Sequence, residues 1–276
     1  MEHHVNHLTQ LVNHYFGGFA LALLSALHIT PRDPAEPIRE HVVMALCVLV
    51  IGTILALIVR SRLSVERPGA TQQVAELLLT NPMGFGIRDL LEENTGHDGV
   101  RYVPMVGSIA IFILLANLMG AFPFLSAPTG EVTVPLACAI LTFIYFNWHG
   151  ARKHGVIGYL HTFAGSPHGV AGWLLAILLF PVEIISTTAR LLSLTVRLWA
   201  NMFASDLVYG IFLSLLAGGF TFGWSKHPVL GIILGIFPAT IPVLFLGLHI
   251  FVSVVQAYVF TVLPAVYLGL ATSEEH

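Results

Sequence analysis

Six ionisable or strongly polar side chains interrupt the last two long apolar stretches of the chain. The first of these stretches carries Glu183, Arg190, Arg197 and Asp206, and the second carries His249 and Gln256. An ionisable group at the centre of a bilayer costs about 3 kcal/mol on insertion scales. Such a series therefore predicts a functional site.

The residue types favour proton transfer around a fixed charge. The carboxyl groups of Glu183 and Asp206 and the imidazole of His249 exchange protons, and burial tunes them towards physiological pH. The guanidinium of Arg197 stays charged in proteins, so it suits an electrostatic gate and not a relay.

Helical spacing sorts these side chains by face and depth. Positions seven apart return to nearly the same direction, so Glu183, Arg190 and Arg197 share one face, whereas Asp206 points the opposite way. His249 and Gln256 are also seven apart. If the two helices run antiparallel with His249 level with Asp206, Gln256 falls level with Arg197.

The elements that must position these residues are membrane helices. Five apolar stretches cover residues 42–59, 103–125, 132–148, 170–223 and 229–271. The first three have ordinary lengths for a span of about 20 residues, and the last two are much longer. We expect the long stretches to form one strongly tilted helix each, joined by a short outer loop around residues 224–226.

Composition agrees with an all-α polytopic membrane protein. Of 276 residues, 56% are hydrophobic and 10% are charged, with a net charge of −3, which excludes an ordinary soluble enzyme and a nucleic-acid-binding protein. Only Cys47 and Cys138 are present, so a disulfide framework and a thiolate metal site are unsupported.

We expect residues 1–40 to form an outer segment with a short interfacial helix, and residues 41–276 to form a single membrane domain with a surface segment over 74–91. Basic residues cluster in two connecting segments and predict that both face the cytoplasm: Arg60, Arg62 and Arg67, then Arg152, Lys153 and His154. The N-terminus is then outside and the C-terminus inside.

Four segments resemble the a subunit of the F-type rotary ATP synthase. They are SLTVRLWANMFASDL (193–207), VVQAYVFTVLPAVYLGL (254–270), NLMGAFPF (117–124) and PVEIIS (181–186), and the resemblance covers roughly residues 40–276. The chain has Asp206 where Glu is frequent in the family, and Ala200 and Ser205 where Gly is frequent. The shorter acid changes the reach from residue 206 to His249.

The resemblance implies a stator subunit with two offset proton half-channels. It places the gate on Arg197 and the outer pair on Asp206 and His249. Further proton-pathway residues implied by the resemblance or by spacing are Gln256, Asn201, Glu183 and Arg190. Its implied partners are a ring of c subunits, the b-subunit peripheral stalk and the other synthase subunits, in the inner membrane of a bacterium.

Several alternatives stay open on the sequence alone. A secondary transporter or an ion channel also places charges at midplane, and the same subunit can belong to a Na⁺-coupled synthase. The chain lacks HExxH, GxSxG and GxxxxGK[ST] strings, so we expect no catalytic site of its own and no cofactor. His3, His4 and His7 have metal-compatible spacing, but an exposed terminal cluster is usually solvated, and we expect no metal.

Overall fold

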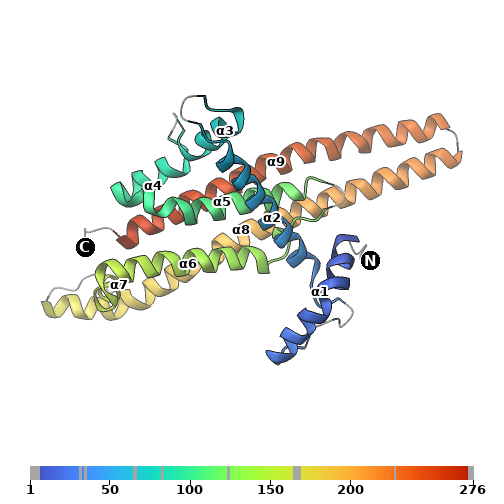
Figure 1. The fold of residues 1–276 in the computed structure, drawn as a ribbon. Coiled ribbons are helices and arrows are strands. Elements are labelled where there is room, and N and C mark those ends of the chain that lie inside the picture. Colours follow the sequence, from blue (N-terminus) through green and yellow to red (C-terminus); the bar gives the residue numbers. More distant parts are fainter. Residues whose placement is uncertain are drawn as a thin grey trace. The chain divides into compact units, whose positions relative to one another are not determined.

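The computed structural model describes residues 7–30, 33, 36–64, 67–81, 84–122, 125–163, 169–226 and 228–272. Regular structure in these residues is entirely helical (Figure 1). The elements are α1 (His7–Ala26), α2 (Glu40–Ser61), α3 (Ala70–Leu79), α4 (Ile87–Thr95), η1 (Gly96–Asp98), α5 (Gly99–Met119), η2 (Pro128–Gly130), α6 (Thr133–His154), α7 (Val156–Phe163), α8 (Gly169–Lys226) and α9 (Pro228–Thr272).

Five of the described helices are long and apolar enough to cross a membrane, which confirms the all-α polytopic prediction. The candidate spans are Glu40–Ser61, Gly99–Met119, Thr133–His154, Ala176–Ser225 and Val243–Thr272. The helices α8 and α9 contain 58 and 45 residues, or about 87 and 68 Å at 1.5 Å per residue. Both exceed a hydrocarbon layer of about 30 Å, as expected for strongly tilted helices.

The loop predicted at residues 224–226 is wrong, because these residues complete α8 and α9 already begins at Pro228. Residues 224–226 include neither glycine nor proline, so nothing in them ends the helix. Proline is well suited to the first turn of a helix, since its missing N–H needs no partner there. The polar residues that predicted a loop therefore lie on the last turn of a helix.

The ends of α2 and α6 follow helix electrostatics. Glu40 lies in the first turn of α2 and Arg60 in the last, and the last turn of α6 contains Arg152, Lys153 and His154. An acidic residue at the start of a helix and basic residues at its end interact favourably with the helix dipole. Gly155 follows α6 with φ of 74°, a left-handed conformation that glycine adopts without strain and that ends the helix.

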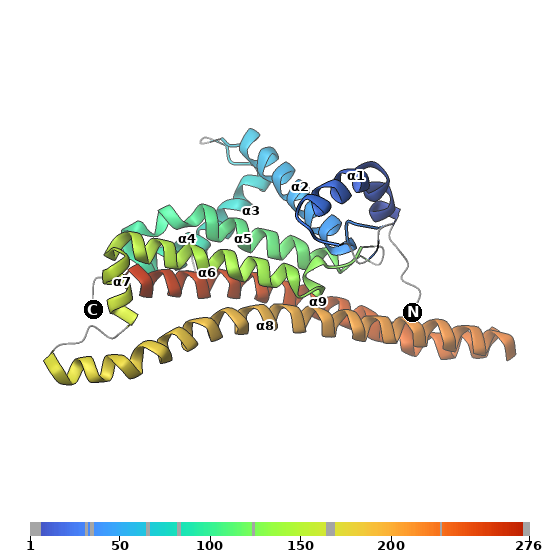
Figure 2. The same ribbon diagram turned by 90° about the horizontal axis from the view of Figure 1, so that it is seen from below.

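The chain divides into two compact units, and each is described by itself. Unit 1 comprises Met1–Thr53, Leu114–Val134 and Ala200–Ser253. In it the side chain of Asn13 on α1 accepts from the Ile38 N–H at 3.0 Å and donates to the Ile38 carbonyl at 2.9 Å. Phe212 on α8 stacks on Phe245 of α9, with 5.6 Å between ring centroids. These parts of α8 and α9 form an antiparallel hairpin in both views (Figures 1 and 2).

Unit 2 comprises Ile54–Ile113, Pro135–Trp199 and Val254–His276. Its core joins α4, α5, α6 and the C-terminal part of α9 (Figure 2). The core residues are Ile87, Leu91, Tyr102, Val106, Ala110, Phe146, Ala265 and Leu268. Gly269 lets α9 approach α4, because a Cβ there would lie 2.4 Å from the carbonyl oxygen of Asn94.

The segment predicted over residues 74–91 consists of two helices, α3 and α4. Ile87, Leu90 and Leu91 of α4 are buried, so this helix contributes one apolar face to the core of unit 2. The Asn81 N–H donates to the carboxylate of Asp89 at 2.7 Å and joins the intervening turn to α4. The location of residues 74–91 on a membrane surface stays a prediction.

Candidate functional site

His249 on α9 is a buried polar side chain of unit 1 that contacts both α8 and α5. It is 5% exposed. Its Nε2 lies 2.9 Å from the main-chain carbonyl oxygen of Asn117, and its Nδ1 lies 2.7 Å from the hydroxyl oxygen of Ser205 on α8. Both ring nitrogens are therefore hydrogen-bonded although the ring is buried, as the cost of burying polar atoms requires.

Neighbouring segments hold this imidazole in place. The Thr129 hydroxyl donates to Asn117 Oδ1 at 2.6 Å and links η2 to the end of α5. A Cβ at Gly120 would lie 3.3 Å from both Cε1 and Nε2 of His249 and 2.9 Å from the Ala127 Cβ. The chain passes directly beside the ring at Gly120, so only glycine fits there without a shift.

A small cavity of about 20 Å³ connects His249 with Asp206. Its lining comes from the end of α5 and from the α8–α9 hairpin: Gly120, Ala121, Ser205, Asp206, Tyr209, Phe245, Leu246 and His249. A volume above about 10–15 Å³ with several polar partners accommodates a water molecule. The site can therefore hold water between a carboxylate and an imidazole.

Asp206 and His249, the predicted outer pair, both line this cavity, and their common depth in a membrane stays a prediction. Among the described residues no ion pair joins them directly. Ser205, which the sequence marked only as a departure from glycine, makes the contact with the ring instead. A Cβ at Gly130 would lie 3.2 Å from Asp206 Oδ2, so this carboxylate packs against η2.

A second polar group lies in unit 2. Arg190 Nη2 is 3.7 Å from Glu183 Oε1 on α8, which agrees with the shared face predicted from their spacing. The guanidinium also lies over the ring of Tyr267 on α9, 5.4 Å from its centroid. Both charged side chains are partly exposed, at 34% and 41% for Arg190 and Glu183. The described chain therefore leaves this pair partly uncovered.

Tyr159 on α7 belongs to the same group and was missed by sequence reasoning. Its hydroxyl donates to Asn147 Oδ1 at 3.1 Å. Its ring lies against Gly150 on α6, where a Cβ would be 2.5 Å from Cε2 of the ring. Burial raises the pKa of Tyr159 to about 12, and the negative charge of Glu183 adds to this rise. The only sequence signal was glycine three residues after Asn147, which is weak by itself.

The other predicted residues are placed as follows. Arg197 and Asn201 are exposed on α8. Within the described part of the chain, the Arg197 side chain has no hydrogen-bond or ion-pair partner. Gln256 is 4% exposed, and its Oε1 has no hydrogen-bond partner among the described residues. The functional roles assigned to all these residues stay predictions.

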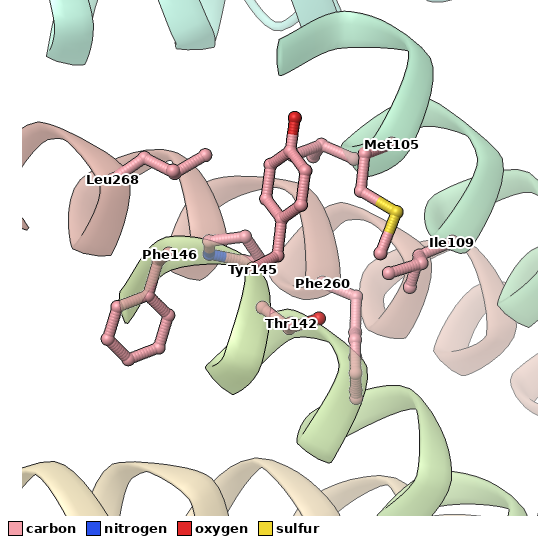
Figure 3. Close-up of a pocket in the computed structure, with 9 residues that line it drawn as sticks. Met105, Ile109, Thr142, Tyr145, Phe146, Phe260 and Leu268 are labelled. Atoms are coloured by element: carbon pink, nitrogen blue, oxygen red, sulfur yellow. The ribbon is translucent and has the colours of Figure 1, made fainter. Parts of the chain in front are cut away.

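An apolar cavity of about 10 Å³ lies between α5, α6 and α9 in unit 2. Figure 3 shows Met105 and Ile109, Thr142 and Tyr145, and Phe260 on its walls. The Thr142 hydroxyl donates to the carbonyl oxygen of Cys138 at 2.9 Å. The cavity is thus a small packing void.

The described residues contain no group of three or more His, Cys, Asp or Glu side chains that could hold a metal ion. His3 and His4 of the N-terminal histidine cluster lie outside the described residues.

Comparisons with known proteins agree with this arrangement. The sequence model of the family described as ATP synthase A chain matches residues 41–269. The chain is 38% identical over 268 residues to an ATP synthase subunit a of Koribacter versatilis (strain Ellin345), covering 97% of each chain. It is 39% identical over 266 residues to that of Solibacter usitatus (strain Ellin6076), covering 96% of this chain and 100% of the relative. With its five apolar helices and buried polar sites, this chain belongs to the ATP synthase A chain family.

Proposed function

We propose that this chain is the stator subunit that carries protons through two offset half-channels of an F-type ATP synthase. The observation that supports this most is the buried imidazole of His249, which shares a water-sized cavity with the carboxylate of Asp206. A carboxylate and an imidazole that share a water-sized cavity suit stepwise proton transfer through water.

In this proposal the outer half-channel ends at the cavity with Asp206 and His249. A proton delivered there passes to a carboxylate on the c ring, and the neutralised rotor subunit then enters lipid. Transmembrane potential supplies about 2.3 kcal/mol per charge for each 100 mV. Asn201 and Gln256 contribute polar groups to the proton pathway.

Arg197 is the gate in this proposal. Its exposed guanidinium, without a partner in the described chain, is available to a carboxylate of another subunit. A permanent cation attracts the ionised rotor carboxylate and repels a free proton, so it separates the half-channels. A side chain already engaged in an internal ion pair would serve this role poorly.

The inner half-channel lies near Glu183 and Arg190, whose partial exposure allows water to reach the carboxylate. The proton leaves there after nearly a full turn of the ring. We place the protein in the inner membrane of a bacterium, with the N-terminus outside, and with the c ring and the b-subunit peripheral stalk as its partners.

The test is ATP-driven acidification of inverted vesicles that contain the assembled synthase, with subunit content measured in parallel. His249→Ala and Asp206→Ala should each slow acidification. The double variant should slow it by less than the two single losses added in full, because either substitution alone already disables the shared site. Fully additive losses would exclude coupling. Normal acidification in all three variants would refute the outer half-channel.

The same vesicles separate proton coupling from sodium coupling. Acidification that requires no added Na⁺ supports protons, whereas Na⁺ uptake that persists with a protonophore present indicates the Na⁺-coupled alternative. Transport in vesicles of the subunit alone, without the other synthase subunits, would favour an independent transporter or channel.

A further inference from the structure

The two ring nitrogens of His249 have different partners, the Ser205 hydroxyl at Nδ1 and the Asn117 carbonyl at Nε2. A main-chain carbonyl oxygen can only accept a hydrogen bond, so the contact of 2.9 Å from Asn117 requires a hydrogen on Nε2. In the neutral ring Nδ1 is then unprotonated and accepts from the Ser205 hydroxyl at 2.7 Å. The two partners together select one tautomer.

The surroundings favour exchange at Nδ1 only. Nε2 faces the end of α5, where Gly120 lies against the ring and His249 is 5% exposed overall. Nδ1 faces Ser205, which lines the cavity together with Asp206. Ser205 and His249 both line the cavity, and the serine hydroxyl lies 2.7 Å from Nδ1, so it can pass a proton between the cavity and this nitrogen.

We propose that Ser205 is a proton-relaying and positioning residue for His249, an inference that rests on the proposed function. A hydronium ion in the cavity gives a proton to Ser205 Oγ, while the original hydroxyl proton passes to Nδ1. One Oγ–H bond forms as another breaks, an Nδ1–H bond forms, and the hydronium becomes water. The reverse sequence returns the proton to the cavity that Asp206 lines.

A serine hydroxyl suits both states of the ring. It donates to the neutral imidazole and, after rotation, accepts from the Nδ1–H of the imidazolium, which is a stronger, charge-assisted bond. The titratable groups that line the cavity besides His249 are Asp206 and Tyr209, both on α8. Residues 117–121 and 127–130, which pack around the ring, are uncharged.

The experiment uses the complete synthase in liposomes and measures ATP-driven pumping as a function of pH. Ser205→Ala should lower the rate about tenfold, the worth of a hydrogen bond to a charged group. It should also move the half-maximal pH lower, because the imidazolium loses its acceptor. Ser205→Thr keeps the hydroxyl and should restore both the rate and the profile.

Ser214→Ala is the matched control, since Ser214 is exposed on the same helix and its hydroxyl donates only to the Ile211 carbonyl. A second measurement is ¹⁵N NMR of histidine-labelled synthase, with His249→Gln identifying the His249 signal. The wild-type neutral ring should be protonated on Nε2, and Ser205→Ala should keep this tautomer, because the Asn117 carbonyl still accepts from Nε2, while the Nδ1 signal shifts because it loses the Ser205 hydrogen bond.

The outcomes separate the relay from the proposed function. If His249→Ala slows pumping but Ser205→Ala changes neither rate nor pH profile, the relay is refuted and the half-channel stands. If Ser205→Thr is as slow as Ser205→Ala, the hydroxyl is not responsible and the relay is again refuted. Normal pumping in His249→Ala refutes the proposed function itself.

Discussion

Glu183 and Arg190, one heptad apart on α8, form an ion pair with 3.7 Å between Oε1 and Nη2. Because both side chains are more than one third exposed, water screens this pair, and its coupling energy should stay below about 1 kcal/mol. The pair is therefore suited to orient the Glu183 carboxylate without covering it.

Arg190→Ala should slow ATP-driven pumping by no more than about fivefold, the equivalent of about 1 kcal/mol, with full assembly. The carboxylate remains hydrated when its partner is lost, so transfer is weakened and not abolished. The measurement is the acidification rate of inverted vesicles beside that of Glu183→Gln. An Arg190→Ala variant without any pumping would show that the arginine acts in the transfer itself.

Tyr159 yields a prediction at alkaline pH. Its folded pKa of about 12 exceeds the usual value, so folding favours the protonated phenol. This contribution to stability is fully present below the unfolded pKa of about 10 and is lost as pH rises through the folded pKa. The unfolding temperature of the assembled synthase should therefore fall between about pH 10 and pH 12.

Tyr159→Phe is the matched variant, because it keeps the ring against Gly150 and removes only the hydroxyl that donates to Asn147. It should shrink the alkaline loss of stability and remove one late-titrating tyrosine from the ultraviolet absorbance of tyrosinate. If absorbance shows that this tyrosine titrates with the exposed ones, the burial argument is wrong.

Gly120 limits what can stand beside His249. In Gly120→Ala the new methyl group would lie 2.9 Å from the Ala127 Cβ and 3.3 Å from the imidazole. Overpacking of this kind costs about 1–3 kcal/mol, and here it also displaces the ring. We expect a lower unfolding temperature and slower pumping.

Gly18→Ala is the control for this substitution. No atom lies within 4 Å of a Cβ at Gly18 on α1, and alanine in a helix interior is favoured by about 0.5–1 kcal/mol. It should leave pumping unchanged. Equal effects of the two substitutions would show that contact with His249 is not the cause.

Hydropathy reveals the membrane spans of this chain but not the contacts between its helices. The five spans could be predicted, since a long apolar helix satisfies its own backbone hydrogen bonds inside lipid. The one-heptad spacing of Glu183 and Arg190 predicted their contact because it lies within one helix. The contacts of Ser205 with His249 and of Tyr159 with Asn147 depend on how separate helices pack, so no local pattern revealed them.

The orientation of the chain can be tested by labelling. In a variant without Cys47 and Cys138, Ser25→Cys and Ser273→Cys should react with an impermeant thiol reagent from opposite sides of the membrane. Ser25 is exposed at the end of α1, and Ser273 lies just beyond the described residues. Labelling of both from one side would contradict the five-span topology.

Arg197 carries the most demanding prediction. A neutral side chain loses both proposed roles of the guanidinium at once, namely attraction of the ionised rotor carboxylate and separation of the half-channels. Arg197→Ala should therefore abolish ATP-driven acidification in vesicles whose subunit content is normal. It should also permit passive proton leak through the membrane sector.

Two further variants make the Arg197 result specific. Arg197→Lys should rescue poorly, because a compact ammonium differs from guanidinium in reach, in hydration and in ease of deprotonation when buried. Arg88→Ala removes an exposed arginine that is paired with Glu92 on α4, and it should leave pumping intact. Normal coupled pumping in assembled Arg197→Ala vesicles would refute the gate and make Arg197 a structural residue.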